Sequence, residues 1–320
     1  MKTAVMQRIA SIAAPAGTKA VRHGVSFDGR LLTLCVSEDI APTLFESHGV
    51  AKTVFMSNGG GFAKTQIPGY EAILLENNRH QNTYRRLRGM TATFPMVQLF
   101  PDGMVLAVAP RCLRSEEHGA ELNAKVFDPS GNCVKAFTLG DGIQDVQVSK
   151  AGEIWVSYFD EGVFGNFGWT SPIGASGLVR FDDTGKVMWE FTAGEIADCY
   201  ALNVFADRAW AYYYTSFELA EVKPGGITRY ETGVDGAHAF ALDSQNVAFL
   251  GGYGKKQANQ ATVLRRAGKK LEAKVTIELG LEDAEFGQSS YQIGRGPMLY
   301  VATPTAWYGI DVHALGKVRA

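Results

Sequence analysis

The sequence has few cysteines, few prolines and almost no net charge, and these shortages exclude several classes of protein. Four cysteines in 320 residues, none in Cys-x-x-Cys spacing, indicate buried thiols in a reducing, cytoplasmic environment rather than a zinc site or a disulfide framework. A formal net charge of -2 at pH 7 predicts no nucleic-acid surface. No apolar run approaches the ~18 residues that span a bilayer, so we expect no membrane association.

Two further signals are weak or missing. The N-terminal stretch Met1–Gly17 resembles a signal peptide only in part, because Gln7 and Arg8 interrupt its apolar region, and we expect it to stay in the mature protein. No Gly-x-Ser-x-Gly motif appears, so the nucleophile turn of α/β-hydrolases is absent.

Glycine is abundant, and a unit of a tight turn followed by an apolar strand recurs. The turns often carry Gly, Asn or Asp, which tolerate positive φ, and the following apolar, aromatic and β-branched residues predict a buried strand. In most copies a second apolar run precedes the turn. The six copies are Phe27–Ser37, Phe100–Pro110, Ser149–Phe159, Phe205–Ser216, Asp243–Tyr253 and Gly294–Thr305.

A second unit, a hairpin around an Asp-x-x-Gly turn, follows several of these copies. It spans Ala124–Phe137 and Gly177–Phe191, with a looser copy at Thr262–Ile277. Two hairpins make four antiparallel strands in about 40 to 55 residues, which is the size of one β-propeller blade. The sequence therefore predicts an all-β propeller that forms a single domain over residues 1–320.

The number of copies favours six blades, with seven as the alternative. The interval between the first two copies is long, but 51–76 is interpreted as the outer hairpin of the first blade and 77–89 as a polar, basic connection. The last blade runs out of chain near His313. We expect the N-terminal segment Thr3–Ile12 to complete it, which would remove an open sheet edge.

These units, together with FDDTGKVMWEF at Phe181–Phe191, resemble the superfamily of bacterial six-bladed β-propellers. That superfamily includes NHL-repeat, senescence-marker and gluconolactonase-like, and YVTN-type proteins. The resemblance covers nearly the whole chain and implies the fold. The Trp-Asp dipeptides of WD40 repeats and the repeated motif of streptogramin lyase are absent. We therefore assign no particular family, and a shared fold implies no shared activity.

Propeller geometry predicts which end of the molecule is functional. The turns within hairpins are tight and share one end, whereas the loops between strands two and three and the links between blades share the other. We call the second end the long-loop face, because binding groups concentrate on long loops. Its long segments are Arg111–Asn123, Asp160–Ser176, Ser216–Gly226 and Gly254–Gln260.

Carboxylates on this face suggest one divalent cation, Ca²⁺ or Mg²⁺. Ca²⁺ takes about six to eight oxygen ligands, which a ring of acidic residues at the channel mouth would supply. The alternative is that these residues cap their own turns. The candidate metal ligands are Asp141, Asp145, Asp160, Asp198 and Asp235.

Histidine beside a carboxylate suggests acid–base catalysis. His238 begins an innermost strand in GAHAFALD and is paired here with Asp145 as the candidate catalytic residues, with His23 a weaker candidate. The alternative is a partly buried histidine bonded to the backbone.

An aromatic, glycine-rich loop suggests recognition of a ligand or partner. Tryptophan and arginine are frequent hot-spot residues, although these rings would also be explained by packing that fixes the loop. The candidate binding residues are Arg111, Glu161, Phe164, Asn166 and Trp169.

Together these patterns favour a monomeric, soluble scaffold that binds a small molecule or a protein partner on its long-loop face. The alternative is a metal-dependent hydrolase or lyase, of the lactonase or gluconolactonase kind, that acts at the mouth of the central channel.

Overall fold

The computed structural model describes residues 2–45, 54–55, 61–62, 65–78, 81–254, 257–287 and 290–318. In these ranges the regular secondary structure is mostly β-strand, as predicted. Helical structure is limited to η1 (Ala41–Phe45), α1 (Asp160–Phe164) and α2 (Val312–Gly316). None of the described helices is long and apolar enough to cross a membrane.

Four sheets of four antiparallel strands follow one another along the described chain. The first contains β2 (Thr18–Val25), β3 (Leu31–Ser37), β6 (Gln66–Asn77) and β7 (Asn82–Ala92). The second contains β8 (Met96–Leu99), β9 (Val105–Val108), β12 (Ala124–Phe127) and β13 (Cys133–Phe137). The third contains β14 (Ile143–Val148), β15 (Ile154–Tyr158), β16 (Leu178–Phe181) and β17 (Val187–Glu190). The fourth contains β18 (Asp198–Phe205), β19 (Arg208–Tyr214), β20 (Glu218–Lys223) and β21 (Gly226–Glu231).

The remaining strands form one eight-stranded sheet and two small hairpins. One half of the large sheet contains β22 (Ala239–Leu242), β23 (Asn246–Leu250), β24 (Gln260–Ala267) and β25 (Lys270–Leu281). The other half contains β26 (Tyr291–Arg295), β27 (Met298–Ala302), β28 (Ala306–Asp311) and β1 (Lys2–Ser11). The hairpins are β4 (Val54–Phe55) with β5 (Gly61–Phe62), and β10 (Arg114–Ser115) with β11 (Gly119–Ala120).

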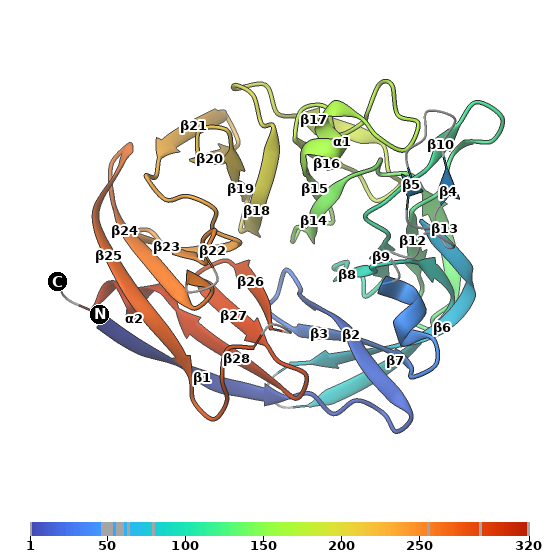
Figure 1. The fold of residues 1–320 in the computed structure, drawn as a ribbon, viewed down its shortest axis with the longest axis horizontal. Coiled ribbons are helices and arrows are strands. Elements are labelled where there is room, and N and C mark those ends of the chain that lie inside the picture. The colour runs from blue at the N-terminus through green and yellow to red at the C-terminus, as the bar shows by residue number, and fades with distance from the viewer. Residues whose placement is uncertain are drawn as a thin grey trace.

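The sheets stand around a central axis in a β-propeller-like arrangement (Figure 1). The first strand of each four-stranded set lies nearest the centre. These strands contact one another in a closed ring, in the order β2, β8, β14, β18, β22, β26 and back to β2. Hydrophobic clusters fill the spaces between neighbouring sheets, as alternating apolar strands require.

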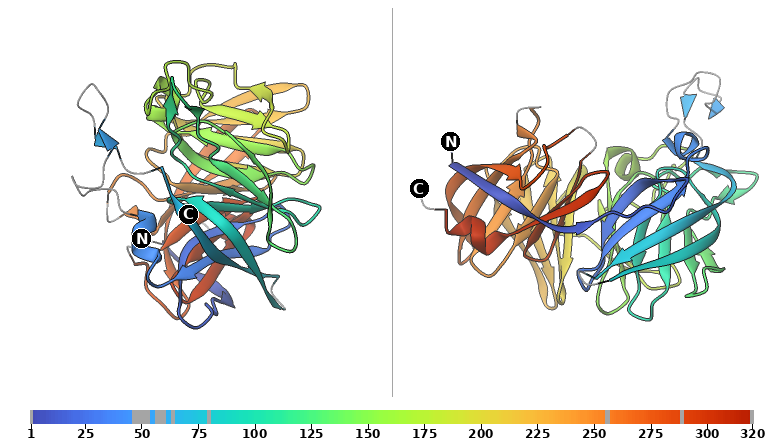
Figure 2. Two further views of the ribbon diagram at one scale, coloured as in Figure 1. Left: turned by 90° about the vertical axis from the view of Figure 1, so that its right-hand side faces the viewer. Right: turned by 90° about the horizontal axis from the view of Figure 1, so that it is seen from below.

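The N-terminal strand β1 joins the two halves of the eight-stranded sheet. Its first part, Lys2–Met6, pairs in parallel with β25, and its second part, Gln7–Ser11, pairs antiparallel with β28. Figure 2 shows this strand running along the edge of the molecule toward β2. The expectation that the N-terminal segment pairs with the last strands is therefore confirmed.

Two sequence interpretations were wrong at the outer strands. Residues 77–89, expected to be a connection, lie mostly in β7, which pairs with β6. Residues Ser216–Gly226, expected to be a long loop, contain β20, which pairs with β19 and β21. Part of 51–76 lies outside the described residues, and its end forms β6.

Candidate functional site

The innermost strands enclose a cavity of about 150 Å³ on the central axis. On β2 the lining residues are the last four, Arg22–Val25, whereas on β8, β14, β18, β22 and β26 the lining begins within the first three residues of the strand, where the links between sheets arrive. The cavity therefore belongs to the long-loop face. Its polar lining residues are Arg22, His23, Gln98, Gln144, Asp145, Gln147, Tyr200, His238, Tyr291 and Gln292.

A buried hydrogen-bond network around Gln147, which lines the cavity, joins β14, β18 and β26. The Gln147 side chain donates to Asp145 Oδ2 (3.0 Å) and to the Leu202 carbonyl (2.8 Å), and it accepts from the Val204 N–H (2.8 Å). The buried Arg295 guanidinium donates to the Gln147 side-chain oxygen and to the Val148 carbonyl. Because burial disfavours its charge, the pKa of Arg295 falls to about 10.

The two candidate catalytic residues, His238 and Asp145, line this same cavity. His238 is exposed and lies just before β22. Burial raises the pKa of the Asp145 carboxyl, against the opposing effect of the Gln147 hydrogen bond. An exposed imidazole and a carboxyl of raised pKa are groups that can exchange protons with a ligand.

His23 is a packing residue. Its Nδ1 lies 3.1 Å from Thr33 Oγ1, and its ring contacts those of Tyr291 and Trp307 edge-on. Burial lowers the pKa of His23 to about 4, so the imidazole is neutral at physiological pH.

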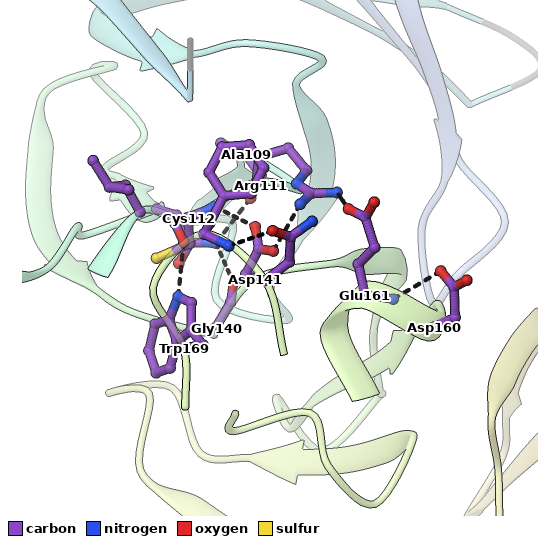
Figure 3. Close-up of polar contacts among 12 residues, drawn as sticks. Ala109, Arg111, Cys112, Gly140, Asp141, Asp160, Glu161 and Trp169 are labelled. Atoms are coloured by element: carbon purple, nitrogen blue, oxygen red, sulfur yellow. Dashed lines mark hydrogen bonds and ion pairs between the residues drawn. The ribbon is translucent and has the colours of Figure 1, made fainter. Parts of the chain in front are cut away.

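Arg111 and Glu161, expected to contact a ligand, instead pair with each other and with a candidate metal ligand. Figure 3 shows the Arg111 guanidinium between Glu161 and Asp141, with the Asp141 carboxylate at 2.9 Å. The guanidinium also lies 4.2 Å from the centre of the Phe167 ring. Asp141 is buried and accepts the Cys112 N–H at 2.7 Å. Its burial raises its pKa to about 6 despite the opposing effect of Arg111.

Trp169, a candidate binding residue, packs inward, as in the alternative that these rings fix the loop. Its side chain is 4% exposed and its Nε1 donates to the Cys112 carbonyl at 2.7 Å (Figure 3). Gly168 has φ +83°, and a Cβ there would lie 2.0 Å from the Arg114 carbonyl oxygen, so the loop turns tightly against its neighbour. Asn166 Oδ1 accepts the Phe167 N–H within this turn. Of the aromatic side chains Phe164, Phe167 and Trp169, Phe164 alone is exposed, at 66%.

The candidate metal ligands do not meet around one point. Among the residues that the structure describes, no three His, Cys, Asp or Glu side chains are placed to hold one ion. Asp141 is paired with Arg111, Asp145 bonds Gln147, and the exposed Asp160 accepts its neighbour's N–H at 2.7 Å. Asp235 is also exposed. The predicted Ca²⁺ or Mg²⁺ site is therefore not formed by this set.

Asp198 is half-buried and has no cationic partner within 4.0 Å in the described part of the chain. Burial, and then the neighbouring Asp160 carboxylate, raise its pKa to about 6. Its negative charge at neutral pH therefore lowers the free energy of unfolding.

Sequence reasoning missed a cluster of aromatic side chains beside the cavity, which we call the aromatic cluster. Tyr200 is at its centre and also lines the cavity. The ring centroids of its neighbours Tyr214, Phe217 and Tyr253 lie 5.9–6.4 Å from that of Tyr200. The run AYYYTSF, residues 211–217, contains two members, and the folded chain brings Tyr200 and Tyr253 to them.

The comparisons with known proteins establish no family. One family model, described as the YxzG family, matches residues 173–275, which is less than half of the chain. No curated protein matches.

Several solved structures align over most of this chain, with low similarity. Apo AztD from Citrobacter koseri shares 9% identity, with TM-score 0.44, over 92% of this chain and 83% of its own. The PQQ-bound aldose sugar dehydrogenase from Streptomyces coelicolor shares 12%, with TM-score 0.46, over 93% and 99%. An extracellular domain of BT4673 from B. thetaiotaomicron shares 11%, with TM-score 0.41, over 94% and 39%. At this level of similarity none of them carries a function to this chain.

We expect the Asp198→Asn variant to be more stable than the wild type at pH 7.5, by about 1 kcal/mol after allowing for partial solvent exposure. In the folded protein the Asp198 pKa is raised to about 6, whereas an unfolded Asp has a pKa near 3.9. The carboxylate therefore destabilises the fold as pH rises from ~4 to ~6, and not below that window. Urea unfolding at pH 4 and pH 7.5 measures this, with the exposed Asp235→Asn as control. An equal effect of Asp198→Asn at both pH values would contradict the expectation.

Proposed function

We propose that this protein binds a small polar molecule in the cavity at the channel mouth. One observation carries the proposal: polar side chains from the innermost strands of different sheets converge on one cavity, beside the Gln147–Arg295 network. A cavity of about 150 Å³ is large enough for a molecule the size of one six-membered ring. Concave sites with a few convergent polar groups are the usual form of small-molecule sites.

One polar side chain of this cavity has a buried acceptor without a donor among the described residues. Gln292 donates from Nε2 to the Ala258 carbonyl at 2.8 Å, but within the described chain its buried Oε1 accepts no hydrogen bond. A buried acceptor without a donor is unfavourable, and a ligand hydroxyl or N–H would satisfy it. Arg22 and Asp145 add one charge of each sign. These groups favour a ligand that has both donors and acceptors.

Calorimetry on hits from a thermal-shift screen of small sugars, sugar acids, amino acids and amino alcohols tests the proposal. We expect Gln292→Leu to weaken binding roughly tenfold, because it removes a hydrogen-bonding group of the cavity, and Asp145→Asn to weaken it more, because it removes the carboxylate charge. Lys150→Ala, at an exposed turn on the opposite end, is the matched control. No binding at millimolar concentration, or hits that bind both cavity variants unchanged, would reject the proposal.

A hydrolase or lyase is the second candidate, because His238 and Asp145 share this cavity. Proton transfer by such a pair needs both groups near the reacting atoms. The metal-dependent form of this candidate has no support from the ligand set proposed above. Conversion of a bound compound during calorimetry, lost in His238→Ala, would favour the enzyme over the binding scaffold.

We also propose that the propeller has six blades. The support is the ring of six innermost strands and the division of the eight-stranded sheet at β1 into two four-stranded halves. In this interpretation β1 is the outer strand of the last blade, as the sequence predicts.

A further inference from the structure

The aromatic cluster lies at the rim of the cavity and is built from three separate segments of the chain. Tyr200 comes from β18, Tyr214 and Phe217 from the end of β19 and the residues after it, and Tyr253 from the loop after β23. The rings of Tyr200 and Tyr214 are nearly parallel, at 14°, whereas Tyr253 meets Tyr200 at 88°. Several aromatic faces and edges therefore meet in one small area.

The cluster is held in place and yet remains exposed. The Tyr200 and Tyr253 hydroxyls are 2.9 Å apart, and the Tyr253 ring covers Gly236, where a Cβ would lie 2.8 Å from it. Phe217 has φ +52°, a strained conformation that is frequent at functional sites. Nevertheless Tyr253 is 64% exposed and Tyr214 is 42% exposed. Ordered aromatic rings that stay open to solvent are suited to binding.

Three carboxylates among the described residues lie near the cluster. Asp198 lies two residues before Tyr200 and Asp235 immediately before Gly236, while Asp160 lies close enough to affect Asp198. In the described residues none of the three has a Lys, Arg or His within 4.0 Å. Carboxylates without cationic partners would repel an anion and attract a cation.

The observations also indicate the kind of cation. A bare metal ion needs several oxygen ligands at short range, and no such group exists among the described side chains. An alkylated ammonium has a diffuse charge and apolar methyl groups, and binds to aromatic faces through cation–π attraction. We propose that the aromatic cluster binds the alkylammonium head group of a small molecule, with Asp198 and its neighbouring carboxylates supplying the complementary charge.

The remainder of the ligand has an adjacent site. Tyr200 belongs to both the cluster and the cavity, so a head group on the cluster places an attached polar tail at the cavity mouth. This placement of the tail rests on the proposed function, whereas the head-group site stands on the cluster alone. The ligand class is then an amino alcohol or related compound with an alkylated nitrogen.

Choline and its neutral isostere 3,3-dimethylbutan-1-ol, titrated separately by calorimetry or NMR at pH 7.5, test the charge requirement. The two probes share size and hydroxyl group and differ in the positive charge. We expect choline to bind at least about fivefold more tightly, since cation–π contacts contribute of the order of 0.5–2 kcal/mol and the carboxylates add to this. Equal affinity of the two probes, or no binding of choline, would overturn the proposal.

Variants locate the site. Tyr253→Leu and Asp198→Asn are each expected to weaken choline binding roughly fivefold, and to leave the weak binding of the neutral isostere nearly unchanged. Phe205→Ala is the matched control, because Phe205 is a 49% exposed aromatic residue at the other end of β18. Lys255→Ala/Lys256→Ala should bind choline at least as tightly, since it removes positive charge from the sequence after Tyr253. Choline binding that neither Tyr253→Leu nor Asp198→Asn weakens would reject the site.

Gln292→Leu separates this inference from the proposed function. Loss of choline affinity in Gln292→Leu as well as in Tyr253→Leu supports a ligand that spans the cavity and the cluster. Loss in Tyr253→Leu alone supports the head-group site and counts against the cavity as the place of the tail.

Discussion

Removal of residues 2–11 is expected to lower the melting temperature by at least about 10 °C or to abolish cooperative unfolding. These residues form β1, which pairs with β25 and with β28 and so connects both halves of the eight-stranded sheet. Met6 within it is fully buried, and truncation of such a side chain alone costs about 2–5 kcal/mol. Loss of the whole strand also exposes two sheet edges, against a total stability that is typically about 5–15 kcal/mol. Differential scanning calorimetry or circular dichroism measures the effect.

Two controls make this result specific. Val5→Lys changes a residue of the same strand that is 51% exposed, and it should leave the melting temperature within about 2 °C. A synthetic peptide of residues 2–11 added to the truncated protein should restore part of the lost stability, because strand and edge can pair again. A truncated protein that melts at the wild-type temperature would mean that β1 does not close the ring.

The inner strands could be predicted from the sequence because each is largely buried and stands directly before a tight turn. MVQLF, IQDVQV and YALNVF, for example, correspond to β8, β14 and β18. Outer strands have a weaker signal, since they are mostly exposed. β7 contains Arg85, Arg86 and Arg88, and its arginines make polar contacts, such as Arg86 with Glu71 and Arg85 with the buried Glu76. Its composition is therefore that of a connection, although its backbone is that of a strand.

The candidate site could be predicted only in part, for a related reason. His238 and Asp145 lie near the starts of innermost strands, and strand geometry alone brings them to the channel. The positions of the loop side chains depend on turns that the sequence does not specify. Trp169 points inward because the glycine-rich loop folds back against Arg114, and Arg111 is occupied because it meets Asp141 from a different sheet link. The aromatic cluster could not be predicted because it forms through contacts between residues of different sheets, such as that between Tyr200 and Tyr253.

Asp141→Ala is expected to destabilise the protein by about 2–4 kcal/mol, whereas Asp141→Asn should change stability by about 1 kcal/mol or less. The alanine variant removes the acceptor of the buried Cys112 N–H and leaves Arg111 with Glu161 as its remaining ion-pair partner. The asparagine variant keeps an oxygen for the Cys112 N–H, and it loses the charge and the second oxygen, which accepts from Arg111. Since burial raises the Asp141 pKa to about 6 despite Arg111, that charge opposes folding at pH 7.5 rather than stabilising the fold, and its removal is not expected to be costly.

Urea unfolding of both variants at pH 7.5 measures the two contributions, and Arg111→Met completes the comparison. If Asp141 acts mainly through its hydrogen bond, the order of stability is wild type and Asp141→Asn close together, with Asp141→Ala well below. Equal losses in Asp141→Asn and Asp141→Ala would instead make the ion pair itself the source of stability.

The expected order means that Arg111 and Asp141 serve to hold the segments 111–123 and 160–176 in one conformation on the long-loop face. Through α1 they also fix the position of Asp160, whose carboxylate adds to the negative charge beside the aromatic cluster.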